Sequence, residues 1–79
     1  MVLQQLLSYI RINYSQIDIE SLTSSEEPWV RAMGLDSIGL VNFIIGVEEL
    51  FEKEFKTSSV YNMNNNFMEF VKIIEQEII

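Results

Sequence analysis

Ser37 is the side chain of this sequence whose type and position best suit covalent chemistry. It follows Gly34 and Asp36 where a helical pattern begins, so we expect its hydroxyl at an exposed helix N-terminus. Backbone N–H groups and the helix dipole there favour an attached anion such as a phosphodiester. Asp36 is a good N-cap residue, and its carboxylate could help a partner enzyme to hold Mg²⁺ during phosphoryl transfer. The simpler alternative is that Asp36 and Ser37 only cap the helix.

The residue types that usually activate a serine are missing from the chain. Its 79 residues include no His and no Cys, which excludes an imidazole base, a thiolate nucleophile and nearly all zinc sites. Adjacent acids at 26–27 and 48–49 point in different directions on a helix, so we interpret them as solvated charge rather than as a catalytic pair. We therefore predict no catalytic residue, no metal site and no enzymatic activity.

Charge and composition narrow the class of protein further. The net charge is −7, from 12 acidic against 5 basic residues, which disfavours nucleic acids and anionic membranes as partners and favours basic proteins. The alternative is that this acidity only keeps the protein soluble. Hydrophobic residues make up 48%, too many for a disordered chain. No stretch approaches the roughly 18 apolar residues of a membrane helix and no export signal is seen, so we expect a cytoplasmic monomer without membrane insertion.

Three amphipathic helices are the elements that must position Ser37. Apolar residues recur at helical spacing over about 2–14, 37–55 and 67–78. Asn66 and Glu69 resemble a capping box at the start of the third helix. The faces expected to be buried are Leu3, Leu6, Leu7, Ile10 and Tyr14 in the first helix, Leu40, Phe43, Ile44, Val47, Leu50 and Phe51 in the second, and Phe67, Phe70, Val71, Ile74 and Ile78 in the third. Because such stripes can be buried only against one another, the sequence predicts an all-α fold.

Two connections join these helices. Residues 15–35 are predicted to be a long polar connection, which Trp29 pins to the core and in which Pro28 starts a short helical turn. Residues 57–66 form the second connection, where a short helix is weakly indicated. Val60, Tyr61 and Met63 are its candidate anchors to the core.

A second apolar stripe begins directly after Ser37. Ile38, Val41 and Ile45 recur at i, i+3 and i+7, rotated away from the face predicted to be buried. We interpret the stripe as a docking surface, toward which neighbouring acids steer basic partners. The predicted docking residues are Ile38, Val41, Asn42, Ile45, Glu48 and Glu49. Gly39 and Gly46 lie beyond the stripe and would leave the surface low there. The alternative is that Val41 belongs to the core, that only Ile38 and Ile45 are exposed, and that the two glycines permit close helix packing.

The sequence Gly-Leu-Asp-Ser-Ile at 34–38, followed by an apolar and acidic helix, resembles the attachment motif of the acyl carrier proteins and peptidyl carrier domains. The resemblance covers most of the chain, including Trp29 in the apolar place before the motif, Glu-Glu-Leu-Phe at 48–51 and the closing helix from 67 to 74. It implies a small four-helix bundle with a short third helix and a long loop between helices 1 and 2. Residues 1–79 would then form a single carrier domain.

The resemblance also implies a function for Ser37 and Asp36. Ser37 would receive a 4′-phosphopantetheine arm from coenzyme A, and this arm would supply the thiol that the chain lacks. The implied partners are a phosphopantetheinyl transferase, an enzyme that loads an acyl or aminoacyl group, and downstream synthases or transferases. The cargo stays open between acyl groups of fatty-acid, polyketide or specialised-lipid synthesis and aminoacyl or peptidyl groups, including D-alanyl. A helical interaction module without a prosthetic group is the remaining alternative.

Several positions depart from the pattern of this family. Gly39 and Asn42 stand where many members carry acids, and Arg31 and Ala32 precede the motif where acids are common. Lys-Thr at 56–57 replaces the usual Pro after the second helix. These departures leave the attachment site intact. They favour a dedicated polyketide, specialised-lipid or nonribosomal-peptide pathway at least as much as a housekeeping fatty-acid synthase.

Overall fold

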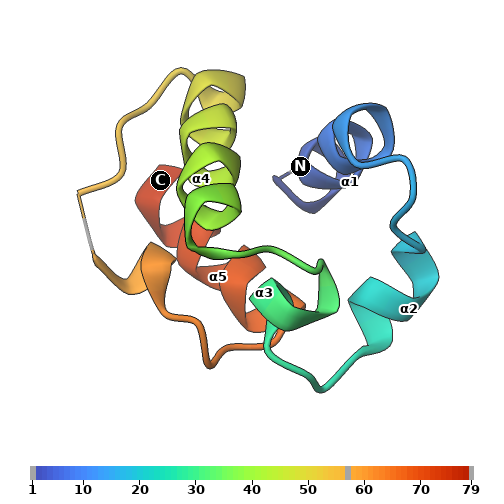
Figure 1. The fold of residues 1–79 in the computed structure, drawn as a ribbon. Coiled ribbons are helices and arrows are strands. Elements are labelled where there is room, and N and C mark those ends of the chain that lie inside the picture. The colour runs from blue at the N-terminus through green and yellow to red at the C-terminus, as the bar shows by residue number, and fades with distance from the viewer. Residues whose placement is uncertain (1, 57, 79) are drawn as a thin grey trace.

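The computed structural model describes residues 2–56 and 58–78, which form helices and loops without any strand (Figure 1). The elements in chain order are α1 (Val2–Asn13), α2 (Ile19–Ser24), α3 (Trp29–Ala32), α4 (Ser37–Phe51), the 3₁₀ turn η1 (Ser58–Tyr61) and α5 (Phe67–Ile78). The prediction of an all-α fold is confirmed. None of the described helices is long and apolar enough to cross a membrane. Thr57, where the second predicted connection begins, lies outside the described residues.

The first and last helices begin and end close to their predicted limits. At the end of α1 the Tyr14 N–H donates to the carbonyl of Ile10 at 2.7 Å, so the helical pattern persists for one residue. At the start of α5 the Asn66 N–H donates to Glu69 Oε1, and the Glu69 N–H donates to Asn66 Oδ1, both at 2.9 Å. This reciprocal pair is the predicted capping box, and it satisfies two backbone donors that the first turn of a helix leaves unpaired.

The second predicted helix ends earlier than expected, at Phe51 rather than near residue 55. Glu52 adopts the left-handed conformation with φ of 53°, and the Lys53 N–H donates to the carbonyl of Glu48 at 3.0 Å. These features close the helix in the manner of a Schellman motif. Glycine is the usual residue at such a position because it has no Cβ, so a glutamate there gave the sequence no stop signal.

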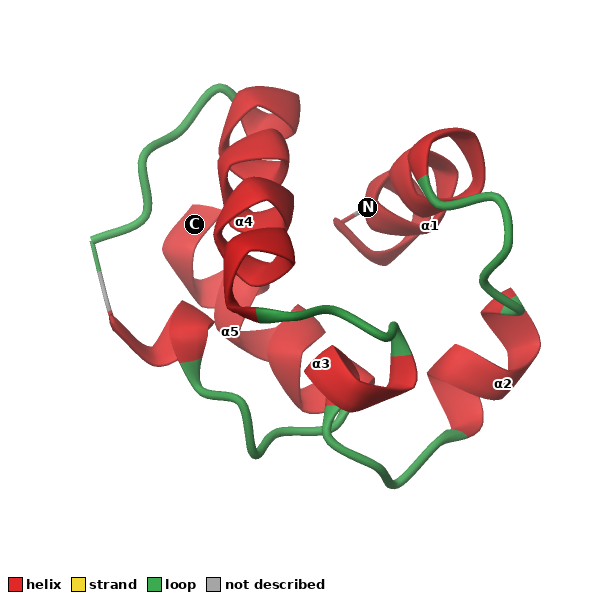
Figure 2. Ribbon diagram, viewed as in Figure 1, coloured by secondary structure: helices red, strands yellow, loops and turns green. Residues whose placement is uncertain are grey.

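The connection predicted over 15–35 contains two short helices, which Figure 2 shows as separate elements. The helical turn expected after Pro28 is α3, whereas α2 was not predicted. Asp18 caps α2, because its carboxylate accepts from the backbone N–H groups of Glu20 and Ser21 at 3.1 and 3.4 Å. Leu22 of α2 is buried and α2 contacts α5, so this connection packs against the last helix.

The core lies where the apolar stripes meet, with α5 in contact with α1, α2 and η1 (Figure 1). Trp29 is fully buried and stacks on Phe70, with 4.2 Å between ring centroids, and it also contacts Phe43 at 5.4 Å. The prediction that Trp29 pins the long connection is therefore confirmed. The buried core residues are Leu6, Leu7, Ile10, Leu22, Trp29, Val30, Met33, Leu40, Phe43, Ile44, Val47, Val60, Phe67, Phe70, Val71 and Ile74.

Three residues predicted to face the core are instead exposed. Leu50 is 38% exposed, because it lies in the last turn of α4 at the edge of the buried face. Within η1 and the loop after it, Val60 alone is buried, whereas Tyr61 and Met63 keep 42% and 49% of their surface accessible. Of the three candidate anchors, Val60 therefore packs into the core, whereas Tyr61 and Met63 lie on the surface.

Gly46 lets α1 and α4 approach each other closely. A Cβ built on Gly46 would collide with the hydroxyl of Tyr9 and would lie 2.8 Å from its Cζ. The Tyr9 ring also contacts Tyr14 and Phe43. Burial, then the neighbouring Tyr14 and Glu49, raise the pKa of the Tyr9 phenol, so this group packs uncharged at neutral pH. Close helix packing, one of the two interpretations of this glycine, is the one that the structure supports.

We predict that Trp29→Ala lowers the free energy of unfolding by about 3–5 kcal/mol, as for other buried aromatic residues. This is a large part of the total stability of a small domain. The indole N–H has no hydrogen-bond partner among the described residues, so Trp29→Phe loses no such bond and should cost less. Urea denaturation followed by circular dichroism measures both variants. An unchanged unfolding midpoint for Trp29→Ala would contradict the anchoring role.

We predict that Gly46→Ala destabilises the protein, although Ala normally stabilises a helix by roughly 1 kcal/mol relative to Gly. Overpacking against Tyr9 typically costs about 1–3 kcal/mol, which should exceed that gain. The control is the same substitution in a Tyr9→Ala background, where the collision is removed and Ala should become stabilising. A gain of stability from Gly46→Ala in the wild-type background would contradict this packing.

Candidate functional site

A turn at Gly34 connects α3 to the start of α4. Gly34 has φ of +69°, a left-handed conformation that suits a residue without a Cβ. Its N–H donates to the carbonyl of Arg31, and the next N–H, of Leu35, donates to the carbonyl of Val30, both at 3.0 Å. The turn closes α3 and places Leu35 against the core. Asp36 and Ser37 therefore follow from an anchored segment.

Asp36 and Ser37 have separate positions at the N-terminus of α4. Asp36 is the N-cap, and its Oδ1 accepts from the backbone N–H of Gly39 at 2.7 Å. Its backbone carbonyl accepts from the N–H of Leu40 at 2.8 Å. Ser37 is the first residue of α4, is exposed, and its hydroxyl makes no hydrogen bond with any described residue. Capping is thus performed by Asp36, and the Ser37 hydroxyl remains accessible for chemistry.

The apolar stripe after Ser37 lies on the solvent side of α4. Ile38 is 74% exposed, Val41 44% and Ile45 45%, so the alternative that Val41 belongs to the core is wrong. Asn42 is exposed beside them. A row of exposed apolar side chains on one helix is unusual on the surface of a small domain and is typical of a contact site.

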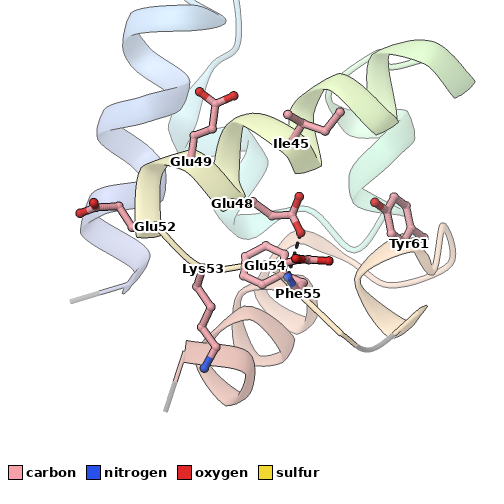
Figure 3. Close-up of a pocket in the computed structure, with 8 residues that line it drawn as sticks. All are labelled: Ile45, Glu48, Glu49, Glu52, Lys53, Glu54, Phe55 and Tyr61. Atoms are coloured by element: carbon pink, nitrogen blue, oxygen red, sulfur yellow. Dashed lines mark hydrogen bonds between the residues drawn. The ribbon is translucent and has the colours of Figure 1, made fainter.

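Beside this stripe, α4 borders an open groove, and Figure 3 shows its lining. The lining residues are Ile45, Glu48, Glu49, Glu52, Lys53, Glu54, Phe55 and Tyr61. Four of the eight carry carboxylates and one carries an amine, so the groove is acidic. Ile45 belongs to both the stripe and the groove, which makes the two surfaces continuous.

The two predicted acidic docking residues have different surroundings. Glu48 is half-buried and its Oε2 accepts from the backbone N–H of Phe55 at 2.8 Å, so it holds the loop after α4 (Figure 3). Glu49 is exposed and points away from that loop. Of the two, Glu49 is thus free to meet a partner, whereas the carboxylate of Glu48 already has a structural hydrogen bond.

A second groove lies directly before Ser37 and was not foreseen from the sequence. Its lining residues are Pro28, Val30, Arg31, Gly34, Leu35, Met63 and Asn64. Arg31 had been singled out only as a basic residue where acids are common, and Met63 only as an anchor. The signal was weak because the two walls are some thirty residues apart in the chain. In the described part of the chain, no three or more acidic side chains gather closely enough to hold a metal ion.

Comparison of the chain with protein-family models, with curated proteins and with solved structures gives no match in any of the three.

Proposed function

We propose that this protein is a carrier that holds acyl intermediates as thioesters on a 4′-phosphopantetheine arm attached to Ser37. The observation that carries the proposal is that Asp36, and not Ser37, caps the start of α4. Asp36 supplies the cap through its 2.7 Å bond to Gly39, while the exposed hydroxyl of Ser37 has no partner among the described residues. A serine in this setting can be modified without loss of the helix that presents it.

The residues around Ser37 fit a 4′-phosphopantetheine arm. A phosphodiester on the Ser37 oxygen would lie at the positive end of the α4 dipole. The arm would supply the thiol for thioester formation, since the chain contains no Cys. The chain's own residues would position the arm and select partners. The fold is compatible with the proposed carrier type, in which α1, α4, η1 and α5 would be the four helices and α2 and α3 would lie within the long first loop.

The proposed partners are a phosphopantetheinyl transferase, an enzyme that loads the arm, and downstream synthases or transferases. Acyl cargo is the first proposal, and aminoacyl or peptidyl cargo is the alternative within the same mechanism. The loading enzyme selects between them, so intact mass of the natively purified protein would identify the cargo. A helical interaction module whose Ser37 stays unmodified is the competing class of function.

We further propose that partners dock on the stripe of Ile38, Val41 and Ile45 and on the exposed side chains of Asn42 and Glu49 beside it. The exposure of three apolar side chains in a row, directly after Ser37, supports this surface. A partner must reach the Ser37 oxygen in any case, so its contacts fall most readily on this part of α4. Acidic residues near the stripe favour a basic partner and increase its rate of association.

We predict that Ser37→Ala abolishes arm attachment and leaves the fold intact. Asp36 still caps α4, so the stability loss should not exceed the roughly 1 kcal/mol of a cap residue. The protein is incubated with coenzyme A and a broad-specificity phosphopantetheinyl transferase, and intact mass is measured. Ser8→Ala, at an exposed serine on α1, is the matched control and should load normally. An unmodified wild-type mass would refute the carrier proposal, and a loaded Ser37→Ala would refute the site.

We predict that Ile38→Asp and Ile45→Asp each lower kcat/KM for loading by that transferase about tenfold or more. This corresponds to about 1.4 kcal/mol of lost docking energy, as for a central contact residue. Ile12→Asp introduces the same charge at an isoleucine on α1 that is 80% exposed, and it should load at the wild-type rate. Circular dichroism checks that all three variants fold. Wild-type loading by both stripe variants would place the docking surface elsewhere.

A further inference from the structure

The groove before Ser37 is formed by two segments that the fold holds together. One wall is α3 with its glycine turn, and the other is the loop that precedes α5. The Trp29 N–H donates to the carbonyl of Asn65 at 2.7 Å and joins the two walls at the base. Val30, 3% exposed, lies beneath. The groove has a volume of about 440 Å³.

The lining combines apolar surface with two polar groups. Pro28 and Leu35 are half-buried, and Met63 is 49% exposed, so much of the wall is aliphatic and Met63 is adaptable in shape. Asn64 adds an amide that can both donate and accept hydrogen bonds. Arg31 adds a guanidinium that forms no ion pair with any described residue. A ligand that fits would carry short aliphatic segments, amide groups and an anionic oxygen.

Arg31 gives this groove a positive charge, whereas acidic residues outnumber basic ones in the chain as a whole. The chain has 5 basic residues against 12 acidic ones, and the groove beside the stripe is lined mainly by carboxylates. The lining of the groove before Ser37 contains Arg31 and no acid. An anion near the start of α4 is therefore attracted to this groove and repelled by the acidic one.

The groove is within easy reach of a group on Ser37. Leu35 lines it and precedes Ser37 by two residues, so their Cα atoms are at most about 7 Å apart. A phosphodiester on Ser37 is anionic, and the pantetheine beyond it alternates amides with short aliphatic segments. This sequence of groups matches the lining in chemistry.

We propose that this groove is the resting site of the arm carried by Ser37, with Arg31 pairing with the phosphodiester. Met63 contacts the aliphatic segments of the arm, and Asn64 hydrogen-bonds its amides. The proposal rests on the proposed carrier function and adds a docked state of the arm. An exposed ion pair of this kind contributes little, and removing it should change the ratio of docked to free arm by a factor of roughly 1.5 to 5. The arm then docks between reactions and is released readily to a partner.

Nuclear magnetic resonance of the apo protein and of the loaded protein, whose single modification is confirmed by mass, tests this proposal. The methyl group of Met63 and the side-chain amide of Asn64 should change chemical shift on loading. Met68 on α5 is 36% exposed, does not line the groove and should not change. Raising the salt from about 0.01 M to about 1 M, which shortens the Debye length from about 30 Å to 3 Å, should diminish the change at Met63.

Variants of the two exposed arginines, Arg11 and Arg31, distinguish a specific ion pair with the arm from an effect of net charge alone. Arg31→Gln should lower the docked-to-free ratio of the arm by the factor above and diminish the shift change at Met63. Arg11→Gln removes the same charge from α1 and should leave that change as in the wild type. Shifts confined to the first turn of α4 in the loaded protein, or equal effects of the two variants, would overturn the resting site alone. A protein that gains no mass would overturn the carrier proposal as well.

Discussion

The burial of Trp29 is the interaction on which the rest of this structure depends. Its ring stacks on Phe70 of α5 and contacts Phe43 of α4, so one side chain of the long connection links the two helices that form much of the core. Its backbone N–H reaches the carbonyl of Asn65 and ties the same connection to the loop before α5. The direction in which the chain enters α4, and hence the place of Ser37, follows from this anchor.

The two faces of the helix α4 differ in burial. Leu40, Phe43, Ile44 and Val47 are buried on one face, whereas the apolar stripe on the opposite face lies open to solvent. At its N-terminus, capping is the task of Asp36 and leaves Ser37 uncommitted. This separation means that the surface proposed to meet partners can be altered without loss of core packing.

The two grooves near the opposite ends of α4 have opposite charge, which supports different proposed roles. The groove at the C-terminal half of α4 is acidic and continuous with the stripe, so it suits a basic partner protein. The groove before Ser37 contains Arg31 and no acid, so it suits an anionic arm. In this proposal a partner approaches along α4 and the arm rests behind its own attachment point, so the two do not compete for the same surface.

The sequence alone determined the features that depend on neighbouring residues. Helical periodicity located α1, α4 and α5, the Asn66–Glu69 pair formed its capping box, and Asp36 capped α4, because each involves contacts within one turn of helix. The rotation of the stripe relative to the buried face predicted its exposure, but whether Val41 was exposed or part of the core was decided by the structure. The stretch around α2 was missed because its signal is a short polar cap rather than a long apolar period.

Only the tertiary structure decided what depends on segments that are distant in the chain. The packing of Tyr9 over Gly46, the hydrogen bond from the Lys56 N–H to Glu77 and the groove shared by Arg31 and Met63 each join such segments. Local periodicity contains no information on which side chains face each other across the core, and that arrangement fixes the surroundings of Ser37.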